Sequence, residues 1–247
     1  MNLVFDLGNS RCKWALEDTV LRPGGALVYG EDFTRTLDQA FESLARPAQV
    51  AAVSVAGAAH TDTLAHWVKR HWSVDLRRFG ARAAQCGVTN TYAVPAQLGA
   101  DRWAALIAAR ARTSDAVCVV DCGTAVTVDA LDVRGVFRGG VIFPGLAPLR
   151  STLLQSTQGI RIADGNASSC VAQTTADAVA AGTAFGLAGA IDRILDEQAA
   201  ALGGAAQVLL TGGDAQRLQA LLRHTTQHVP DLVLEGVARM ANMEGVA

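Results

Sequence analysis

The first half of the chain alternates short apolar runs with segments of helical period. An apolar run of roughly four to eight residues is typical of a buried strand, whereas apolar residues three and four positions apart are typical of an amphipathic helix. These patterns predict, in order, strands at 2–8, 11–17 and 26–29, a helix at 33–44, a strand at 50–55, a helix at 61–72 and a strand at 74–79. Strands that alternate with helices favour a mostly parallel sheet covered by helices.

The second half repeats this theme after an irregular segment at 80–98 and an Ala-rich helix predicted at 101–112. We place the boundary between two domains, 1–115 and 116–247, beside this helix, which fits either half. The elements predicted beyond it are strands at 116–122, 125–131 and 135–142, a helix at 148–155, a mobile loop at 158–172, a long helix at 175–201, a strand at 206–211, a helix at 214–224, a short strand at 232–234 and a terminal helix.

Each half begins with the same local motif. An apolar strand runs into Asp6-Leu7-Gly8-Asn9-Ser10 in the first half and into Asp121-Cys122-Gly123-Thr124-Ala125 in the second. A glycine lets the backbone approach a ligand closely, neighbouring amides can hold phosphate oxygens, and an aspartate can hold a cation that bridges phosphates. One such turn is more typical of an ordinary hairpin. Its repetition, together with a third glycine turn at Thr211-Gly212-Gly213-Asp214, favours phosphate binding over an ordinary hairpin.

Composition narrows the class of protein. The chain has 247 residues, of which 50% are hydrophobic and only 5% aromatic, so Ala, Val and Leu fill a substantial core. A net charge of -2 and a pI near 6.2 argue against a general nucleic-acid binder. We expect no signal peptide and no apolar run long enough to span a bilayer. The five scattered cysteines and five histidines complete no metal-site spacing, which favours reduced thiols in a cytoplasmic protein.

The most specific pattern is Asn90-Thr91-Tyr92-Ala93-Val94-Pro95-Ala96-Gln97-Leu98-Gly99-Ala100-Asp101-Arg102-Trp103. With the two Asp-x-Gly turns and Gly139-Gly140-Val141-Ile142-Phe143-Pro144-Gly145, it resembles the type III pantothenate kinases over nearly the whole chain. The order of the three turns also resembles the actin, Hsp70 and sugar-kinase ATPase superfamily. The resemblance implies an α/β fold of two related ribonuclease-H-like domains with ATP in a central cleft. It also implies phosphorylation of pantothenate to 4′-phosphopantothenate, the first step of coenzyme A synthesis.

Asp101 is the candidate base for the hydroxyl of pantothenate, because phosphoryl transfer needs a group that accepts the proton of the attacking alcohol. An aspartate before an Ala-rich run also fits a helix N-terminus, and the two roles are compatible. Arg102 fits either a solvated helix charge or a clamp on the carboxylate of pantothenate. The resemblance implies substrate contacts from Tyr92, Gly99, Ala100, Asp101, Arg102 and Thr175. The neighbouring Thr174 could take the place of Thr175, and either also fits a helix cap.

On the nucleotide side, the resemblance implies that Asp6 acts on Mg²⁺ through water and that Asp121 holds a monovalent cation, K⁺ or NH₄⁺. Lys13 also fits a strand residue that faces solvent, and Asp129 matches the family pattern but fits a structural role as well. The predicted ATP contacts are Asp6, Leu7, Gly8, Asn9, Ser10, Arg11, Cys12, Lys13, Thr124, Gly212 and Gly213.

Two other functions remain open from sequence. The first is a kinase of the same superfamily that acts on another small molecule and differs in segment 90–102. The second is a regulatory or accessory protein that keeps the fold without turnover. Such a protein would have lost part of the machinery, whereas this chain retains Asp6, Asp101, Arg102, Asp121 and Thr124.

The resemblance further implies a homodimer in which the partner lends residues to the substrate pocket. The long helix predicted at 175–201 contains Gly182, Gly186 and Gly189, which lower intrinsic helix stability. Such glycines suggest close packing against another backbone, and they fit a contact within the chain as well as one between chains.

Overall fold

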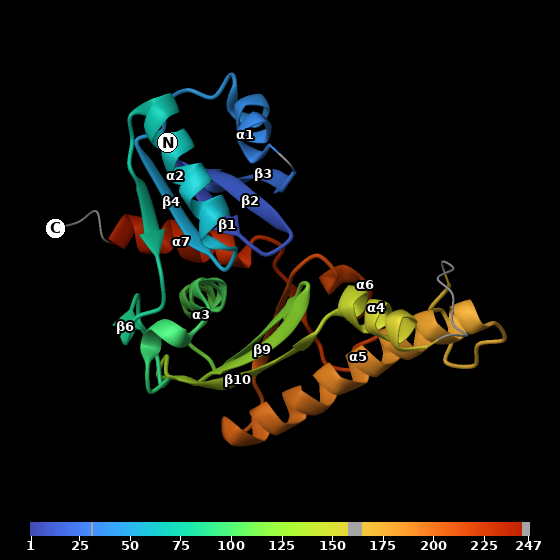
Figure 1. Cartoon of the computed structure of the whole chain (residues 1–247). Helices are drawn as coiled ribbons and strands as arrows, with labels where there is room; N and C mark the ends of the chain where they lie inside the picture. Colours follow the sequence, from blue (N-terminus) through green and yellow to red (C-terminus); the bar gives the residue numbers. More distant parts are fainter. Residues whose placement is uncertain (31, 158–164, 244–247) are drawn as a thin grey trace. The chain divides into compact units, whose positions relative to one another are not determined.

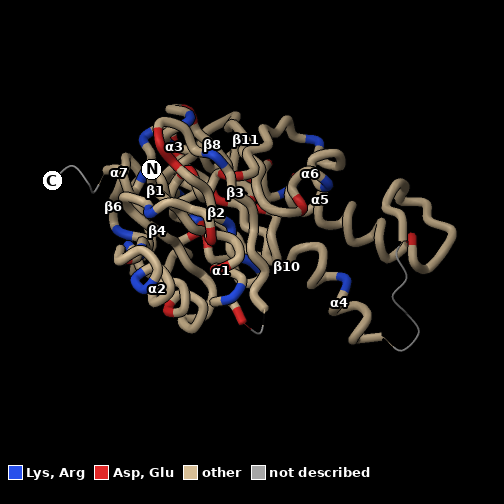
Figure 2. Tube along the Cα trace, turned by 90° about the horizontal axis from the view of Figure 1, so that it is seen from above, with Lys and Arg blue, Asp and Glu red and all other residues tan. Residues whose placement is uncertain are grey.

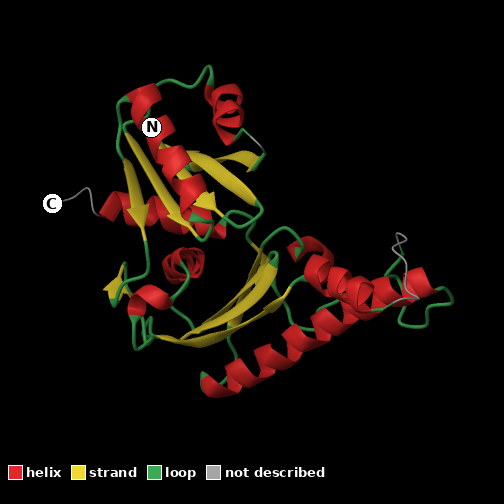
Figure 3. Cartoon of the chain, viewed as in Figure 1, coloured by secondary structure: helices red, strands yellow, loops and turns green. Residues whose placement is uncertain are grey.

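The computed structural model describes residues 1–30, 32–157 and 165–243, which form two compact units (Figure 1). The first unit consists of Met1–Ser114, Gly135–Phe137 and Asp231–Ala247. The second consists of Asp115–Arg134 and Arg138–Pro230. Each unit contains one five-stranded sheet with helices packed against it, as Figure 3 shows by secondary structure.

The sheet of the first unit has the order β3-β2-β1-β4-β5. Its first three strands form an antiparallel meander, and β4 and β5 extend the sheet in parallel. The strands are β1 (Asn2–Leu7), β2 (Arg11–Glu17), β3 (Leu21–Val28), β4 (Gln49–Ser54) and β5 (Leu76–Phe79).

Helices cover both faces of this sheet (Figure 1). One face carries α1 (Phe33–Phe41) and α2 (Ala58–Trp72), and the other carries α3 (Ala100–Arg112) and α7 (Leu232–Met243). Alternate residues of β1 point to the α1–α2 side, where Leu3, Phe5 and Leu7 pack with aromatic side chains of both helices. On the other side, a Cβ added at Gly236 of α7 would collide with the carbonyl of Ala104, so α3 and α7 pack backbone to backbone.

The sheet of the second unit has the order β10-β9-β8-β11-β12, the same arrangement relative to chain order as in the first unit. Its strands are β8 (Val117–Cys122), β9 (Ala125–Leu131), β10 (Phe137–Pro144), β11 (Gln207–Thr211) and β12 (Gln227–His228). The antiparallel β8–β9 pair and the parallel β8–β11 pair match β1–β2 and β1–β4. The prediction of two related α/β domains is therefore confirmed.

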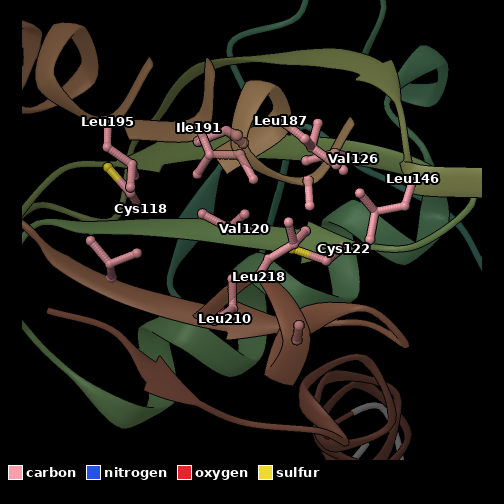
Figure 4. Packing of buried hydrophobic residues seen from close by; sticks show 14 residues of the cluster. Cys118, Val120, Cys122, Val126, Leu146, Leu187, Ile191, Leu195, Leu210 and Leu218 are labelled. Carbon is pink, nitrogen blue, oxygen red and sulfur yellow. The ribbon is translucent and has the colours of Figure 1, made fainter. Parts of the chain in front are cut away.

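Three helices pack on one face of this second sheet: α4 (Leu146–Ser156), α5 (Thr175–Ala201) and α6 (Ala215–Gln219). Figure 4 shows the resulting core, in which Cys118, Val120 and Cys122 of β8 face aliphatic side chains of these helices. Most of these side chains are small or aliphatic, in agreement with the low aromatic content.

Helix α5 is the one described helix that is long and apolar enough to cross a membrane by length and composition, although charged residues interrupt its apolar run. The expectation from the sequence considered uninterrupted apolar runs, whereas the many alanines raise the mean hydropathy of the whole helix. A single helix of this kind is weak evidence for a membrane span, because the core helix of a soluble protein meets the same criteria. In α5, 44% of the most apolar stretch is buried. Leu187, Ile191 and Leu195 pack against the sheet, and buried Asp192 accepts backbone hydrogen bonds from Arg223 and His224.

Several predicted elements differ from the structure in extent or type. The third strand begins at Leu21 rather than at residue 26, and the helix expected at 214–224 ends at Gln219. The strand predicted at 232–234 is wrong: Leu232, Val233 and Leu234 form the first turn of α7. An apolar run of three residues is too short to show either a strand or a helix periodicity. The irregular segment 80–98 contains β6 (Ala84–Gln85), β7 (Val88–Thr89) and a short 3₁₀ helix at Pro95–Gln97.

The compact units also differ from the predicted halves, since the terminal helix α7 belongs to the first unit and not to the second. The reason is that α7 buries its apolar side on α3, β1 and β4. Of the loop predicted to be mobile, residues 158–164 lie outside the described part of the chain, and 165–172 form neither helix nor strand.

All five cysteines are free thiols, and Cys12, Cys118 and Cys122 are buried. Burial raises the pKa of each of these three thiols, to about 12 for Cys118 and Cys122, and thereby suppresses the reactive thiolate. We expect iodoacetamide to modify exposed Cys170 first in the native protein, then half-buried Cys86. Mass spectrometry should find all five modified only after denaturation. Native labelling of the buried three at the rate of Cys170 would contradict this packing.

Candidate active site

Asp101 lies in the first turn of α3, behind a glycine cap. Its Oδ1 accepts a hydrogen bond of 2.7 Å from the backbone N–H of Arg102. Gly99 is the N-cap residue, and a Cβ there would lie 2.6 Å from the same oxygen. The Gly-Ala-Asp sequence therefore leaves room for the carboxylate at the helix N-terminus.

Burial raises the pKa of the Asp101 carboxyl, and this effect exceeds the opposing influence of the Arg102 backbone hydrogen bond and of the Arg102 charge. A carboxylate with a raised pKa is a stronger base than an ordinary aspartate. Perturbed carboxyl groups of this kind are common at catalytic sites.

Arg102 and Tyr92 form a hydrogen-bonded pair beside Asp101. The Arg102 residue is only 6% exposed, and its Nη1 donates to the Tyr92 hydroxyl over 3.2 Å. Both side chains also lie against the ring of Phe137, with Tyr92 at 5.7 Å between ring centroids. A guanidinium carries several N–H donors in a fixed fork, which suits recognition of a carboxylate or phosphate. The structure thus brings together the predicted acceptor-site residues of the first unit: Tyr92, Gly99, Ala100, Asp101 and Arg102.

The first predicted phosphate turn joins β1 to β2. Asp6 ends up opposite Lys13 in the strand register, and the Gly8 N–H donates to the Arg11 carbonyl over 3.1 Å. Asn9 and Ser10 lie exposed at the tip, followed by exposed Arg11. The side chains of Leu7 and Cys12 are fully buried in the core, so only their backbone is available to a ligand.

A buried tyrosine hydroxyl lies behind this turn. The Tyr29 hydroxyl has no hydrogen-bond partner in the described part of the chain, and its ring stacks on His60 at 4.0 Å between centroids. Burial raises the pKa of Tyr29, and charges on Cys12 and Asp6 raise it further.

The second predicted phosphate turn joins β8 to β9 in the same way. The Gly123 N–H donates to the Ala125 carbonyl over 3.1 Å, and Thr124 is exposed. Gly145 supports the turn from behind: its N–H donates to the Thr124 carbonyl over 2.9 Å, and a Cβ there would lie 2.8 Å from that oxygen. The glycine that ends the Gly139–Gly145 motif is therefore required by close approach to this turn.

Asp121 lies against the backbone of two glycines. A Cβ at Gly212 would be 2.5 Å from Asp121 Oδ1, and one at Gly123 would be 3.6 Å from it. Gly212 has φ +97, a conformation that favours glycine. Gly213 follows it, exposed, before the Asp214 N–H donates to the Cys122 carbonyl. A carboxylate oxygen in such a narrow backbone cradle suits a hard cation with oxygen ligands.

No group of three His, Cys, Asp or Glu side chains that could hold a metal ion occurs among the described residues. A cation at Asp6 or Asp121 would therefore draw its other ligands from water, backbone carbonyls or phosphate. Such mixed oxygen coordination is usual for Mg²⁺, which keeps several waters and binds through one or two carboxylates plus phosphates.

The two threonines at the start of α5 have different surroundings. Thr174 is the N-cap: its Oγ1 accepts from the Asp177 N–H at 3.1 Å and donates to Asp177 Oδ2 at 2.8 Å. The first residue of the helix, Thr175, is exposed and lines a groove of about 700 Å³ on the second unit. Asp129, by contrast, is 1% exposed within β9, where it is paired with Val119 in the strand register.

Sequence reasoning did not single out Asn90, Thr91 or Phe137 as site residues. Asn90 Oδ1 accepts from the Tyr92 N–H, and Thr91 Oγ1 donates to the Phe137 carbonyl. Asn90 and Thr91 belong to the motif at residues 90–103, so the sequence already pointed to this segment. Phe137 lies outside this motif, and its sequence context is that of any apolar residue in a predicted strand, so the sequence did not point to it.

The chain is similar to known proteins over nearly its whole length. The family described as type III pantothenate kinase matches residues 2–197. A type III pantothenate kinase from Alkalilimnicola ehrlichii is 42% identical over 245 residues, covering 98% of each chain. One from Halorhodospira halophila is 39% identical over 255 residues, covering 99% of each.

Among solved structures, a putative 2-dehydro-3-deoxygalactonokinase from Sinorhizobium meliloti superposes with a TM-score of 0.65 at 17% identity, covering 100% of each chain. A conserved putative Baf family transcriptional activator from Campylobacter jejuni gives a TM-score of 0.62 at 20% identity, covering 99% of this chain and 100% of that one. At such identities the likeness concerns the fold alone.

Proposed function

Because the chain belongs to the type III pantothenate kinase family, we propose roles for its residues in the reaction of that family. The enzyme transfers a phosphoryl group from ATP to pantothenate in coenzyme A biosynthesis and uses a divalent metal ion with ATP. Family membership favours this function over the two alternatives left open by the sequence. The observation that carries our assignments is the half-buried Asp101 carboxyl, whose pKa is raised, in the first turn of α3 next to the Arg102–Tyr92 pair.

In the proposed reaction, the primary hydroxyl oxygen of pantothenate attacks the γ-phosphorus of ATP. The bond from that phosphorus to the β–γ bridging oxygen breaks, and ADP leaves. Asp101 accepts the hydroxyl proton as the new bond forms, and its raised pKa favours this transfer. Arg102 and Tyr92 hold the carboxylate of pantothenate, while the backbone at Gly99 and Ala100 leaves space beside the base. Thr175 adds a hydroxyl to the substrate site, since that of Thr174 is engaged in capping.

The two glycine turns are proposed to hold the phosphates of ATP. Asn9 and Ser10 lie exposed in the first turn next to Gly8, and Thr124 lies exposed in the second turn, where their backbone and side-chain polar groups would contact phosphate oxygens. Asp6 would bind Mg²⁺ through water, and the ion would neutralise charge on the phosphates. Lys13, Arg11 and the backbone at Leu7 and Cys12 would complete the first site. Gly212 and the exposed Gly213 would lie next to adenosine.

A monovalent cation, K⁺ or NH₄⁺, is proposed to bind at Asp121. The support is the position of its carboxylate along the backbone of Gly123 and Gly212. The ion would supply positive charge near the second phosphate turn.

The deciding experiment measures ATP-dependent phosphorylation of pantothenate by the purified chain with Mg²⁺, comparing K⁺ or NH₄⁺ with Na⁺. We expect turnover that depends on K⁺ or NH₄⁺. Turnover that does not depend on K⁺ or NH₄⁺ would support the kinase activity and contradict the proposed cation site at Asp121. Absence of turnover with every ion, in folded protein, would redirect attention to another acceptor alcohol and then to an accessory role.

We also propose that the enzyme is a homodimer that associates through the α4–α5 face of the second unit. The groove of about 700 Å³ on this face is lined by Phe143, Pro144, Leu149, Leu153 and apolar or small residues of α5. Residues 178–191 of α5 carry no charge, which appears as an uninterrupted tan stretch in Figure 2. Among the described residues, nothing lies within 4 Å of a Cβ placed at Gly182 or Gly186, so packing within the chain does not require these glycines.

Association through this groove predicts that Gly186→Arg yields a monomer in sedimentation velocity, because a charged side chain would occupy the surface that receives the partner. Gly189→Arg is the matched control, since Gly189 lies on the same helix with open space around it but does not line the groove. A Gly186→Arg protein that remains dimeric, or an unaltered chain that is active as a monomer, would refute this interface.

We place the enzyme in the cytoplasm, with neither nucleic acid nor a membrane as a partner. The support is the net charge of -2 and the five free thiols.

A further inference from the structure

A three-residue segment far along the chain is built into the acceptor side of the first unit. Gly135–Phe137 covers the last two residues before β10 and the first residue of that strand, yet it groups with the first unit. The Thr89 N–H donates to the Gly135 carbonyl over 2.8 Å, and Thr89 forms a parallel bridge with Val136. Gly135 has φ +78, and a Cβ there would collide with the carbonyl of Gly87. Backbone contacts therefore fix this segment next to residues 90–103.

Phe137, the last residue of the segment, contacts both side chains that are proposed to bind the carboxylate of pantothenate. Its ring lies 5.7 Å from the Tyr92 ring and 5.9 Å from the guanidinium carbon of Arg102. Its carbonyl accepts a 2.6 Å hydrogen bond from Thr91 Oγ1. Phe137 is 0% exposed, so it supports Tyr92 and Arg102 from the protein interior and has no surface for the substrate.

The loop that carries Tyr92 has its own support. Asn90 Oδ1 accepts from the Tyr92 N–H at 3.0 Å, Asn90 Nδ2 donates to the Pro95 carbonyl at 3.1 Å, and the residue is 8% exposed. The backbone path is thus held without Phe137. What the Phe137 ring adds is the orientation of two side chains, one of which is a long arginine with many rotamers.

We propose that Phe137 is a positioning residue that fixes the Arg102 and Tyr92 side chains for the carboxylate of the acceptor. A cation lying over an aromatic ring is attracted to it, and the attraction strengthens away from water. Orienting donors before the substrate arrives lowers the cost of binding. Phe137 thereby contributes to selection of acceptors that carry a carboxylate. This inference rests on the proposed roles of Arg102 and Tyr92.

The test compares Phe137→Leu with Phe41→Leu. Both phenylalanines are fully buried in the first unit, but the ring of Phe41 contacts the rings of Phe5, Trp14, Trp67 and Trp72. We expect Phe137→Leu to raise the KM for pantothenate roughly tenfold while the KM for ATP stays within about twofold. Phe41→Leu should lower Tm and leave both KM values unchanged. Equal effects of the two variants on the KM for pantothenate would overturn the proposal.

A double-mutant cycle with Arg102→Ala separates this inference from the proposed function. If Phe137 acts through Arg102, most of its effect on the KM for pantothenate disappears in the Arg102→Ala background. A full effect in that background would overturn the positioning role and leave the Arg102 assignment standing. An Arg102→Ala enzyme with an unchanged KM for pantothenate would overturn the Arg102 assignment and this inference together.

A milder variant serves if Phe137→Leu does not fold. Thr91→Val removes the hydrogen bond to the Phe137 carbonyl while nearly preserving side-chain volume, and Thr91 is exposed. We expect calorimetric titration with pantothenate to show a Kd raised about threefold, with ATP binding unchanged. An unchanged Kd for pantothenate in this variant would count against the proposal.

Discussion

We expect Asp101→Asn to lower kcat by about a hundred- to ten-thousand-fold, because the amide cannot accept the proton of the attacking hydroxyl. Asparagine keeps the shape of the side chain and an oxygen that can accept the Arg102 N–H. The fold and the affinity for ATP should therefore remain. Steady-state kinetics with pantothenate, together with ATP titration, measure both expectations. A variant that retains most of its turnover would exclude Asp101 as the base.

The pH dependence of the activity provides a second test of Asp101 as the base. A base must be ionised, so activity falls as pH decreases through the pKa of Asp101. Because burial raises that pKa, the acid limb of kcat/KM should lie above the ordinary aspartate value of 3.8. Asp75→Asn is a suitable control, since the Asp75 side chain is 83% exposed in an ion pair with Lys69. The control should keep the wild-type rate and pH profile.

The raised pKa also predicts a stability effect of definite sign. The folded state favours the protonated form of Asp101, so this group's contribution to stability is fully present below its unfolded pKa. That contribution is lost as pH rises through the folded pKa. At neutral pH the ionised carboxylate is therefore a cost to the fold. Asp101→Asn should match or exceed the Tm of the unaltered enzyme there, and a large loss of Tm would indicate a mainly structural role.

We expect Asp121→Asn to abolish stimulation by K⁺ or NH₄⁺ and to lower kcat on the order of a hundredfold, comparable to loss of one preorganised charge-stabilising group. The substitution removes the negative charge but retains the volume that fits against Gly123 and Gly212. Rates measured against K⁺ concentration at fixed Mg²⁺ and ATP give the result.

Asp196→Asn provides the comparison within the second unit, because Asp196 lies on the surface with a side chain 55% exposed. It should respond to K⁺ like the unaltered enzyme. If Asp121→Asn keeps the same K⁺ dependence as this control, the cation binds elsewhere.

The strands and helices with strong periods could be predicted from sequence almost to the residue. Helix α5 has its predicted bounds, because Thr174 caps its start and the apolar pattern continues to Ala201. The two turns were recognisable because glycine and aspartate recur at the same spacing after each first strand. The resemblance of segment 90–103 then suggested the side chains that we propose for the acceptor site, and two of them, Tyr92 and Arg102, are hydrogen-bonded to each other.

What sequence could not provide depends on contacts between distant residues. Phe137 reaches Arg102 only because Gly135 fits against Gly87. Similarly, Leu232–Leu234 reads as either a strand or a helix until the packing of Gly236 against Ala104 is known. Asp121 shows the same limit: its neighbour Gly212 lies some ninety positions away, and only the parallel pairing of β8 with β11 brings them together.

The return of α7 to the first unit has a consequence for biosynthesis. A ribosome delivers the N-terminus first, so α7 (Leu232–Met243) emerges after the other described segments of both units, yet it belongs to the unit that contains β1. Until then, the side of α3 that α7 covers lacks its partner, and the nascent first unit exposes apolar surface. The second unit's segments are all available earlier. A stop codon just before Leu232 should therefore yield a chain that aggregates through its N-terminal half, although every residue assigned to the chemistry has been translated.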